Sequence, residues 1–431
     1  MQYLGCNKLF SMQQNNRSSY MVSFFLVGCL YFIFGFITWL NGTLIPFLKL
    51  ACELTIQQAS LVTFAFFISY FVMAIPSSAI LKKTGFKNGM SLGLLVMALG
   101  CIIFIPAAMQ RNYTYFLAGL FMQGIGLCLL QTAVNPYVTI IGPIESAAQR
   151  ISVMGICNKA AGFLSPIVVG SILLHNMDDL KKQLEGAVSN KEALLAELSG
   201  RIINPYITLT IVLVIVAILI RFSPLPDIKD EENDAIDHTT SNRPLGSYTY
   251  LFLGALAIFT YVGVEVLAGD YIIMYGGYLK VEDTYVKYLT SLTLAFMVGG
   301  YFMGVALTPK VLSQESLLRI CLIVSLLLIT GVLLTTGKTS VLLLALLGFT
   351  HAIMWPAIWP MSIKDLGKHT KIGSALLIMG IAGGAVIPYI WGWLSDRHGG
   401  NMQQAFWIMI PCYVYMLFFA VKGHLIGYRK D

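Results

Sequence analysis

Several polar and charged side chains stand inside long apolar stretches of this sequence, where they can bind a polar solute or move a charge. Gln131 and Asn135 are four residues apart and so share one helix face, and Asn158 and Lys159 lie in the next apolar segment. Such groups are costly in a bilayer unless they face a water-filled cavity or a partner. An alternative is that the amides only hydrogen-bond neighbouring helices together. We expect the function here, because the Lys159 ammonium needs an anion, carbonyl groups or water.

Two carboxylates occupy one apolar stretch later in the chain. Glu265 lies deep in it, so the side chain should be protonated or paired, and Lys159 is the expected partner. The alternative is a structural ion pair with no functional role. Asp270 lies nearer the end of the stretch, either as a second functional carboxylate or at a solvated rim.

Aromatic side chains mark two further candidate positions. Trp355 and Trp359 are four apart beside two prolines, and an indole face is a platform for the apolar face of a sugar. The alternative for these tryptophans is the interface belt of a membrane protein. Trp39 and Asn41 lie in a polar notch of the first apolar stretch and can meet a polar ligand. His351 is expected to be a hydrogen-bonded core residue.

The composition indicates a polytopic membrane protein. Of 431 residues, 57% are hydrophobic and only 11% are charged, too few to coat a soluble globule of that size. The net charge of +7 reflects basic residues at the ends of apolar segments, so it bears on topology and predicts no nucleic-acid partner. The sequence contains no recognisable P-loop, nucleotide fingerprint, metal-ligand spacing or catalytic triad. We therefore expect no enzymatic activity, no metal site and no cofactor.

Apolar stretches of roughly 20 residues predict membrane-spanning helices. Twelve are present, and the even number places both termini on one side of the membrane. Basic residues are concentrated in the loops on that side, which predicts that both termini are cytoplasmic. The predicted spans are 22–48, 57–81, 88–108, 112–141, 150–175, 203–222, 248–277, 285–308, 317–336, 339–362, 371–395 and 402–424.

The middle of the chain predicts a division into two six-helix halves. Residues 223–247 are largely polar and acidic and contain several prolines, as in a linker, between an N-terminal half at 1–222 and a C-terminal half at 248–431. A weak internal echo supports duplication: NPYVTIIGP before SVMGI in the first half resembles WPMSIKDLG before LIMGI in the second. Parallel halves related by a pseudo-two-fold axis are the basis of the major facilitator fold.

The motifs LNGTLIPFL, LQTAVNPYVTIIGPIESAAQRIS, MGICNKAAG, YVGVEVLAGD and MWPAIWPMSIKDLGKHT resemble the fucose permease branch of the major facilitator superfamily. Within that branch the details are similar to the bacterial glucose/galactose transporter group, some relatives of which carry N-acetylglucosamine. The resemblance covers nearly the whole membrane region. It implies a secondary active sugar importer of the inner membrane that works by alternating access. A monomer is the family default.

The sequence departs from the fucose permease pattern at its titratable positions. The resemblance places Gly42 where that permease has an aspartate in helix one, and Gln131 where it has a glutamate in helix four. Asn158 matches a sugar-binding asparagine and keeps its type. The proton route of the permease therefore cannot be carried over. We expect the coupling charge at Glu265, either with Lys159 as its switchable counter-ion or as part of a sodium site, and the sequence leaves proton and sodium open.

The amides Asn41, Gln131, Asn135 and Asn158 suit sugar hydroxyls, because each group both donates and accepts hydrogen bonds. Glucose or galactose is the expected substrate, with N-acetylglucosamine or fucose as alternatives. A non-transporting sugar sensor on the same fold is a third possibility. The sequence does not favour it, because the predicted extensions and linker are short.

Overall fold

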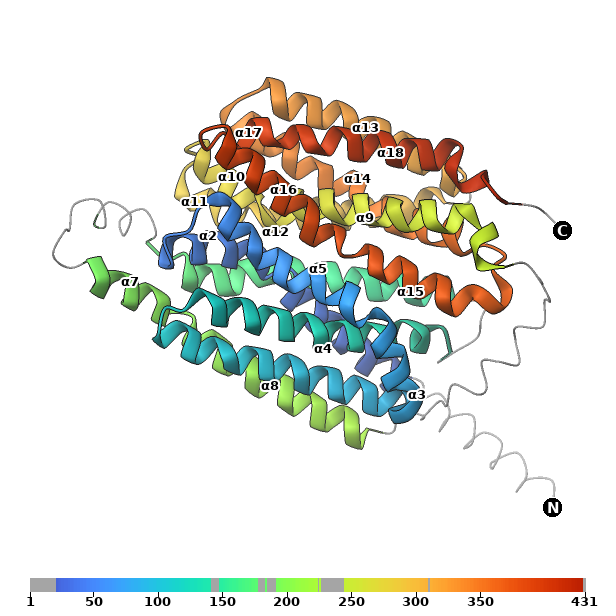
Figure 1. Ribbon diagram of the computed structural model, residues 1–431, viewed down its shortest axis with the longest axis horizontal. Coiled ribbons are helices and arrows are strands. Elements are labelled where there is room, and N and C mark those ends of the chain that lie inside the picture. Colours follow the sequence, from blue (N-terminus) through green and yellow to red (C-terminus); the bar gives the residue numbers. More distant parts are fainter. Residues whose placement is uncertain are drawn as a thin grey trace, which may run out of the picture.

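The computed structural model describes residues 21–140, 147–176, 183, 191–223, 225, 244–308 and 311–428. Within these ranges the chain is helical and contains no strand, which confirms the predicted all-α class. The long helices lie side by side (Figure 1). After a first helical segment at 21–38, the main helices are α2 (Asn41–Ala51), α3 (Ile56–Met109), α4 (Tyr113–Ile140), α5 (Ala147–Leu173), α7 (Lys191–Gly200), α8 (Ile203–Phe222), α9 (Thr249–Asp270), α10 (Ile272–Tyr278), α11 (Asp283–Val286), α12 (Leu289–Leu307), α13 (Gln314–Leu334), α14 (Gly337–Ile363), α15 (Thr370–Gly380), α16 (Gly383–Arg397), α17 (Met402–Ala405) and α18 (Met409–Val421).

The described residues contain 11 helical stretches that are long and apolar enough to cross a membrane. They account for all twelve predicted spans, because α3, with 54 residues, contains two of them. These two spans meet at Gly85, whose φ of 77° and ψ of 167° lie outside the helical range. Glycine adopts a positive φ without a steric penalty, so the chain can bend sharply there.

Three of the spans are interrupted, and two of these breaks lie close to predicted site residues. The first breaks at a turn over residues 39–40, just before α2. Another breaks between α9, which ends at Asp270, and α10, which begins at Ile272. A third breaks between α15 and α16. Interrupted helices expose backbone polar groups and are tolerated in membranes where protein or a cavity surrounds them.

The helices form two groups that follow the chain order. In Figure 1, α3, α4, α5 and α8 lie in the lower part of the bundle, and α9, α13, α14 and α18 lie in the upper part. The groups meet where α3 packs against α16 and α5 packs against α12. Most of the predicted linker, 223–247, lies outside the described residues, so the boundaries of the two halves stay a prediction.

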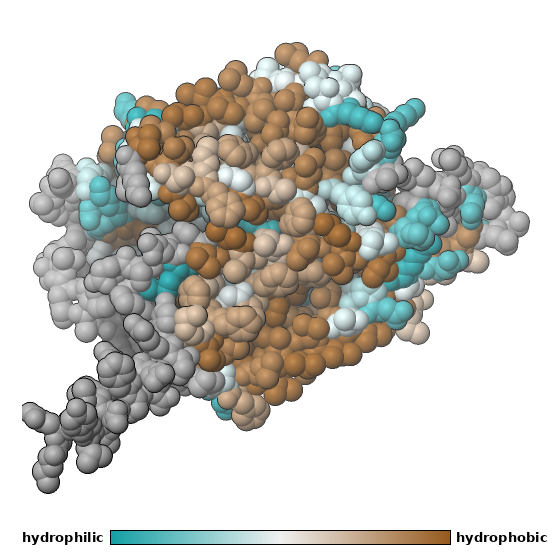
Figure 2. Space-filling model, turned by 180° about the vertical axis from the view of Figure 1, so that it is seen from behind, coloured by the Kyte–Doolittle hydropathy of each residue, from teal (hydrophilic) through white to brown (hydrophobic). Residues whose placement is uncertain are grey.

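The outer surface of the bundle is apolar. Figure 2 shows one face on which hydrophobic residues predominate, with polar residues gathered towards the two ends. Among the large exposed side chains are Phe222, Leu334 and Met109, at 83%, 79% and 75% exposure. Apolar exposure on this scale is unfavourable in water but suits the hydrocarbon core of a bilayer. The chain is therefore a multi-pass membrane protein.

Hydrogen bonds join the two groups at one end of the bundle. We call this the α11 end, since α7, α11 and α17 lie there, and call the opposite end, with the bend in α3, the Gly85 end (Figure 1). At the α11 end, the Asp396 carboxylate of α16 accepts hydrogen bonds from the backbone N–H groups of Ile56 (3.2 Å) and Gln57 (2.8 Å). Gln57 Nε2 also donates to the Tyr389 hydroxyl at 2.9 Å. A carboxylate at a helix N-terminus is favourable, so these contacts hold the α11 end closed.

Candidate functional site

The predicted ion pair between Lys159 and Glu265 is present in the interior. Lys159 Nζ lies 2.9 Å from Glu265 Oε1, and the two side chains are only 10% and 11% exposed. Lys159 belongs to α5 and Glu265 to α9, so the pair connects the two groups of helices. Removing one partner would leave an uncompensated buried charge on the other. The pairing is confirmed, while its role in coupling stays a prediction.

Trp39, at the break in the first span, lies against this pair. The Lys159 ammonium is 4.5 Å from the centroid of the indole, a favourable cation–π distance. A Cβ on Gly162 of α5 would lie 2.4 Å from Trp39 Cδ1, and one on Gly269 of α9 would lie 2.4 Å from Trp39 Cζ3. Only glycine therefore leaves room for the indole on both sides. In this conformation Trp39 is 4% exposed and contacts Lys159, and the predicted contact with a solute stays a prediction.

The predicted amides of α4 and α5 gather around two tyrosines. The Tyr31 hydroxyl donates to Asn135 Oδ1 at 2.7 Å, and Asn158 Nδ2 donates to the Tyr31 carbonyl at 3.4 Å. Gln131 Nε2 donates to the Tyr70 hydroxyl at 3.0 Å. Sequence reasoning missed Tyr31 and Tyr70. Their signal is a hydroxyl within an apolar span, because a buried tyrosine needs a hydrogen-bond partner.

The aromatic side chains of α14 form a stack beside α9. The rings of Trp355 and Trp359 are stacked at 5.2 Å with an interplanar angle of 28°, and Tyr261 of α9 lies 6.3 Å from Trp355. Both tryptophans are partly exposed, which suits a platform for a ligand. His351 is fully buried, and its Nε2 is hydrogen-bonded to the Tyr413 hydroxyl at 2.7 Å, as predicted for a core histidine.

Asp270 is in the interior, so its placement at a solvated rim is wrong. The residue is 0% exposed, and neither carboxylate oxygen makes a hydrogen bond of normal geometry. It faces Gly42 of α2, where an added Cβ would lie 3.3 Å from Asp270 Oδ1 and 2.7 Å from Thr290 Oγ1. Asn41 is also buried, at 1% exposure, and its Nδ2 has no hydrogen-bond partner. Two of the predicted site residues thus keep unused hydrogen-bonding atoms near the helix breaks.

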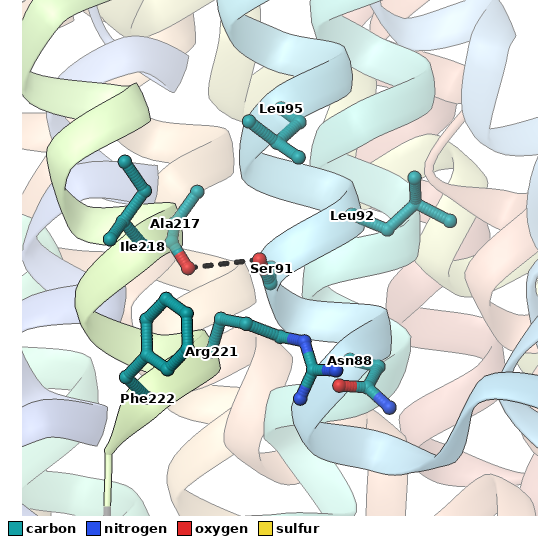
Figure 3. A pocket seen from close by; sticks show the side chains of 8 residues that line it. All are labelled: Asn88, Ser91, Leu92, Leu95, Ala217, Ile218, Arg221 and Phe222. Carbon is teal, nitrogen blue, oxygen red and sulfur yellow. Dashed lines mark hydrogen bonds between the residues drawn. The ribbon is translucent and has the colours of Figure 1, made fainter.

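A pocket of about 300 Å³ lies away from these residues, between α3 and α8 (Figure 3). Ser91 Oγ crosses it to donate to the Ala217 carbonyl at 2.9 Å. The pocket shares no residue with the predicted site and opens among apolar side chains of the outer surface. Its lining residues are Asn88, Ser91, Leu92, Leu95, Ala217, Ile218, Arg221 and Phe222.

The fold and the site define the class of protein: a multi-pass membrane transporter whose two helix groups meet at a buried ion pair. Residues 27–388 match the Major Facilitator Superfamily. The chain belongs to the major facilitator superfamily and is a transporter, not an enzyme.

Individual relatives cover almost the whole chain. The glucose/galactose transporter of Brucella abortus biovar 1 (strain 9-941) is 32% identical over 419 residues, which are 95% of this chain and 96% of that one. The L-fucose-proton symporter of Escherichia coli (strain K12) is 30% identical over 414 residues, 93% of each chain. Among solved structures, the transporter FucP in the outward conformation has a TM-score of 0.69 at 28% identity, with 96% of this chain and 100% of that chain covered. The predicted resemblance to the fucose permease branch is confirmed.

Proposed function

We propose that this protein imports a hexose, glucose or galactose, by symport with a cation through alternating access. The names of its relatives support this substrate class, and the site offers what the transport needs. Amide and hydroxyl groups of Tyr31, Asn135 and Asn158 can exchange their mutual hydrogen bonds for those of sugar hydroxyls. The partly exposed Trp355 provides an aromatic face for the sugar ring.

The observation that carries the proposal is the Lys159–Glu265 pair. It joins α5 to α9 at 2.9 Å in the interior, so any separation of the two helix groups there must break it or replace its partners. An interaction that exists in one conformation and not in the other is a suitable switch, because a ligand can shift the equilibrium only through such differences. The pair therefore links the arrangement of the two groups to charge inside the protein.

The proposal includes an orientation in the bacterial inner membrane. The positive-inside rule supports placing the Gly85 end and both termini in the cytoplasm. The α11 end then faces outward, and the structure corresponds to a state closed towards the outside by Asp396 and Tyr389. A monomer with no nucleic-acid partner completes the proposal, with lipid and a small sugar as the only partners.

Uptake into vesicles that contain the purified protein tests this function. Labelled glucose, galactose, N-acetylglucosamine and L-fucose would each be offered under an imposed cation gradient and without one. We expect glucose or galactose to accumulate above the external concentration only with the gradient. Accumulation of N-acetylglucosamine or fucose alone would move the substrate to the alternative hexoses. Failure of all four sugars to enter or exchange would contradict the proposed function.

A further inference from the structure

The two carboxylates of α9 are buried in different electrostatic situations. Glu265 has a counter-ion, since Lys159 Nζ is 2.9 Å away. Asp270 is 0% exposed, and neither of its oxygens has a hydrogen-bond partner. A bare carboxylate without a partner is among the costliest groups that a protein interior can hold. Asp270 must therefore be neutral in this conformation, or bind a cation.

No group around Asp270 is free to neutralise it. On its own helix, Glu265 is another acid, and the adjacent Tyr271 hydroxyl is hydrogen-bonded to Thr63 at 2.6 Å. From α5, Lys159 is the cation within electrostatic reach, but its ammonium is bound to Glu265. From α2, the Gly42 amide is a backbone donor beside the carboxylate, but it makes no hydrogen bond of normal geometry to it. Among the described residues, the charge of Asp270 is thus left uncompensated.

The hydroxyl of Thr290, from α12, favours the protonated acid. Thr290 Oγ1 donates its proton to the Gly269 carbonyl at 2.7 Å. Thr290 Oγ1 and Asp270 Oδ1 both lie within 3.3 Å of the position that a Cβ on Gly42 would take, although no hydrogen bond joins them. Because its proton is used in the hydrogen bond to Gly269, the hydroxyl oxygen of Thr290 offers only lone pairs to any other neighbour. Lone pairs repel a carboxylate but can accept a hydrogen bond from a carboxylic acid.

The space around Asp270 favours a proton over a metal cation. A hard cation needs several oxygen ligands around it. At Gly42, even a Cβ would be only 2.7 Å from Thr290 Oγ1, so the contact between α2, α9 and α12 is already filled. In the part of the chain that the structure describes, no group of three or more His, Cys, Asp or Glu side chains could hold a metal ion. A proton requires no additional room.

We propose that Asp270 is the proton-binding group of the symport, which rests on the proposed function. With the α11 end open, a hydronium ion of the outside solution transfers its proton to the Asp270 carboxylate and becomes water. Closure of that end then buries the neutral acid between Gly42 and Thr290. When the groups separate at the Gly85 end, Asp270 releases the proton to cytoplasmic water and becomes a carboxylate again. A charged Asp270 opposes closure, because the closed site offers it no counter-ion.

The test compares Asp270→Asn with the wild type in vesicles, using labelled galactose and glucose. We expect proton-driven accumulation to fall by about tenfold or more, in the range of ordinary coupling energies, while exchange of sugar across the membrane continues. In the wild type, sugar exchange should slow at high pH. In Asp270→Asn, the rate of exchange should not depend on pH. Asp365→Asn makes the same chemical change at an exposed residue and should behave as the wild type.

Each other outcome is also decisive. The assignment would be overturned if the Asp270→Asn variant still accumulated sugar. It would also be overturned if sodium alone drove accumulation in the wild type. Wild-type protein that neither accumulates nor exchanges sugar would instead refute the proposed function, and the assignment with it. If Asp270→Asn fails to transport, its thermal unfolding midpoint in detergent shows whether it is still folded. Because asparagine closely resembles the neutral acid, this midpoint should equal that of the wild type. A large drop would mean that the fold needs the charged carboxylate and would overturn the proposal.

Discussion

The surroundings of Glu265 and Asp270 show two ways of burying a carboxylate on one helix. Glu265 lies among charged and aromatic neighbours, with the Lys159 ammonium on one side and Trp39 beneath that ammonium. Asp270, five residues later, lies among backbone and hydroxyl groups at the helix break. The first carboxylate is balanced by a protein cation. The second has no such balance, so it is suited to gain and lose a proton from outside the protein.

Breaking the balanced region should have the largest effect. Lys159→Ala leaves Glu265 buried without a counter-ion, and we expect a loss of stability of about 3–5 kcal/mol together with loss of transport. Thermal unfolding in detergent measures the first and vesicle uptake the second. The double variant Lys159→Met/Glu265→Gln removes both charges and should recover most of the stability. If Lys159→Ala alone were as stable as the wild type, the pair would not be buried as the structure has it.

Crowding the unbalanced region should have the next largest effect. Gly42→Ala places a Cβ 2.7 Å from Thr290 Oγ1 and 3.3 Å from Asp270 Oδ1, so the helices must move apart. Overpacking of this kind costs about 1–3 kcal/mol and should reduce proton-driven uptake more than exchange. Gly246→Ala is the matched control, since a Cβ there meets nothing within 4 Å. Equal uptake by the two variants would show that the contact at Gly42 is not needed.

Weakening the α11 end tests whether closure isolates Asp270. Asp396→Asn removes the negative charge that accepts hydrogen bonds from Ile56 and Gln57 at the N-terminus of α3, an interaction of about 0.3–1 kcal/mol. The fraction of molecules closed at the α11 end should fall. Distances between spin labels placed on α2 and α16 would measure this change. Asp365→Asn provides the control for the loss of one surface carboxylate. An unchanged distance distribution would mean that other contacts maintain the closure.

The aromatic stack of α14 lies outside both carboxylate regions, so changes there should alter sugar binding and leave coupling intact. Trp355→Ala removes one ring of the stacked pair. Aromatic contacts contribute about 0.5–1.5 kcal/mol, so KM should rise by roughly two- to tenfold with little change in kcat. The accumulation ratio at saturating sugar should match that of the wild type. A reduced ratio with unchanged KM would place Trp355 in coupling and not in the sugar site.

Much of the fold is predictable from the sequence because the bilayer imposes strong constraints. Apolar length predicts the spans, and the bend at Gly85 lies within the short basic sequence KKTGFKNG (residues 82–89) between two of them. The Lys159–Glu265 pair is predictable too, since buried opposite charges require each other. Both inferences depend on composition along the chain and hardly on helix rotation.

The details of the site were less predictable because they depend on helix breaks and rotation. Spacing cannot show that Trp39 lies between Gly162 and Gly269 instead of facing a solute. Hydropathy places Asp270 near the end of a span, where a solvated position is equally reasonable. Its burial arises from the packing of α2 and α12 around the end of α9, which is a tertiary property.

Difference infrared spectroscopy on the purified protein tests the central claim most directly. A protonated carboxylic acid has a C=O stretch distinct from the bands of a carboxylate, and the wild type is compared with Asp270→Asn and Glu265→Gln. We predict a protonated-acid band in the wild type that persists in Glu265→Gln and disappears in Asp270→Asn. A band that is absent from the wild type, or that is lost only in Glu265→Gln, would contradict the assignment of the proton to Asp270.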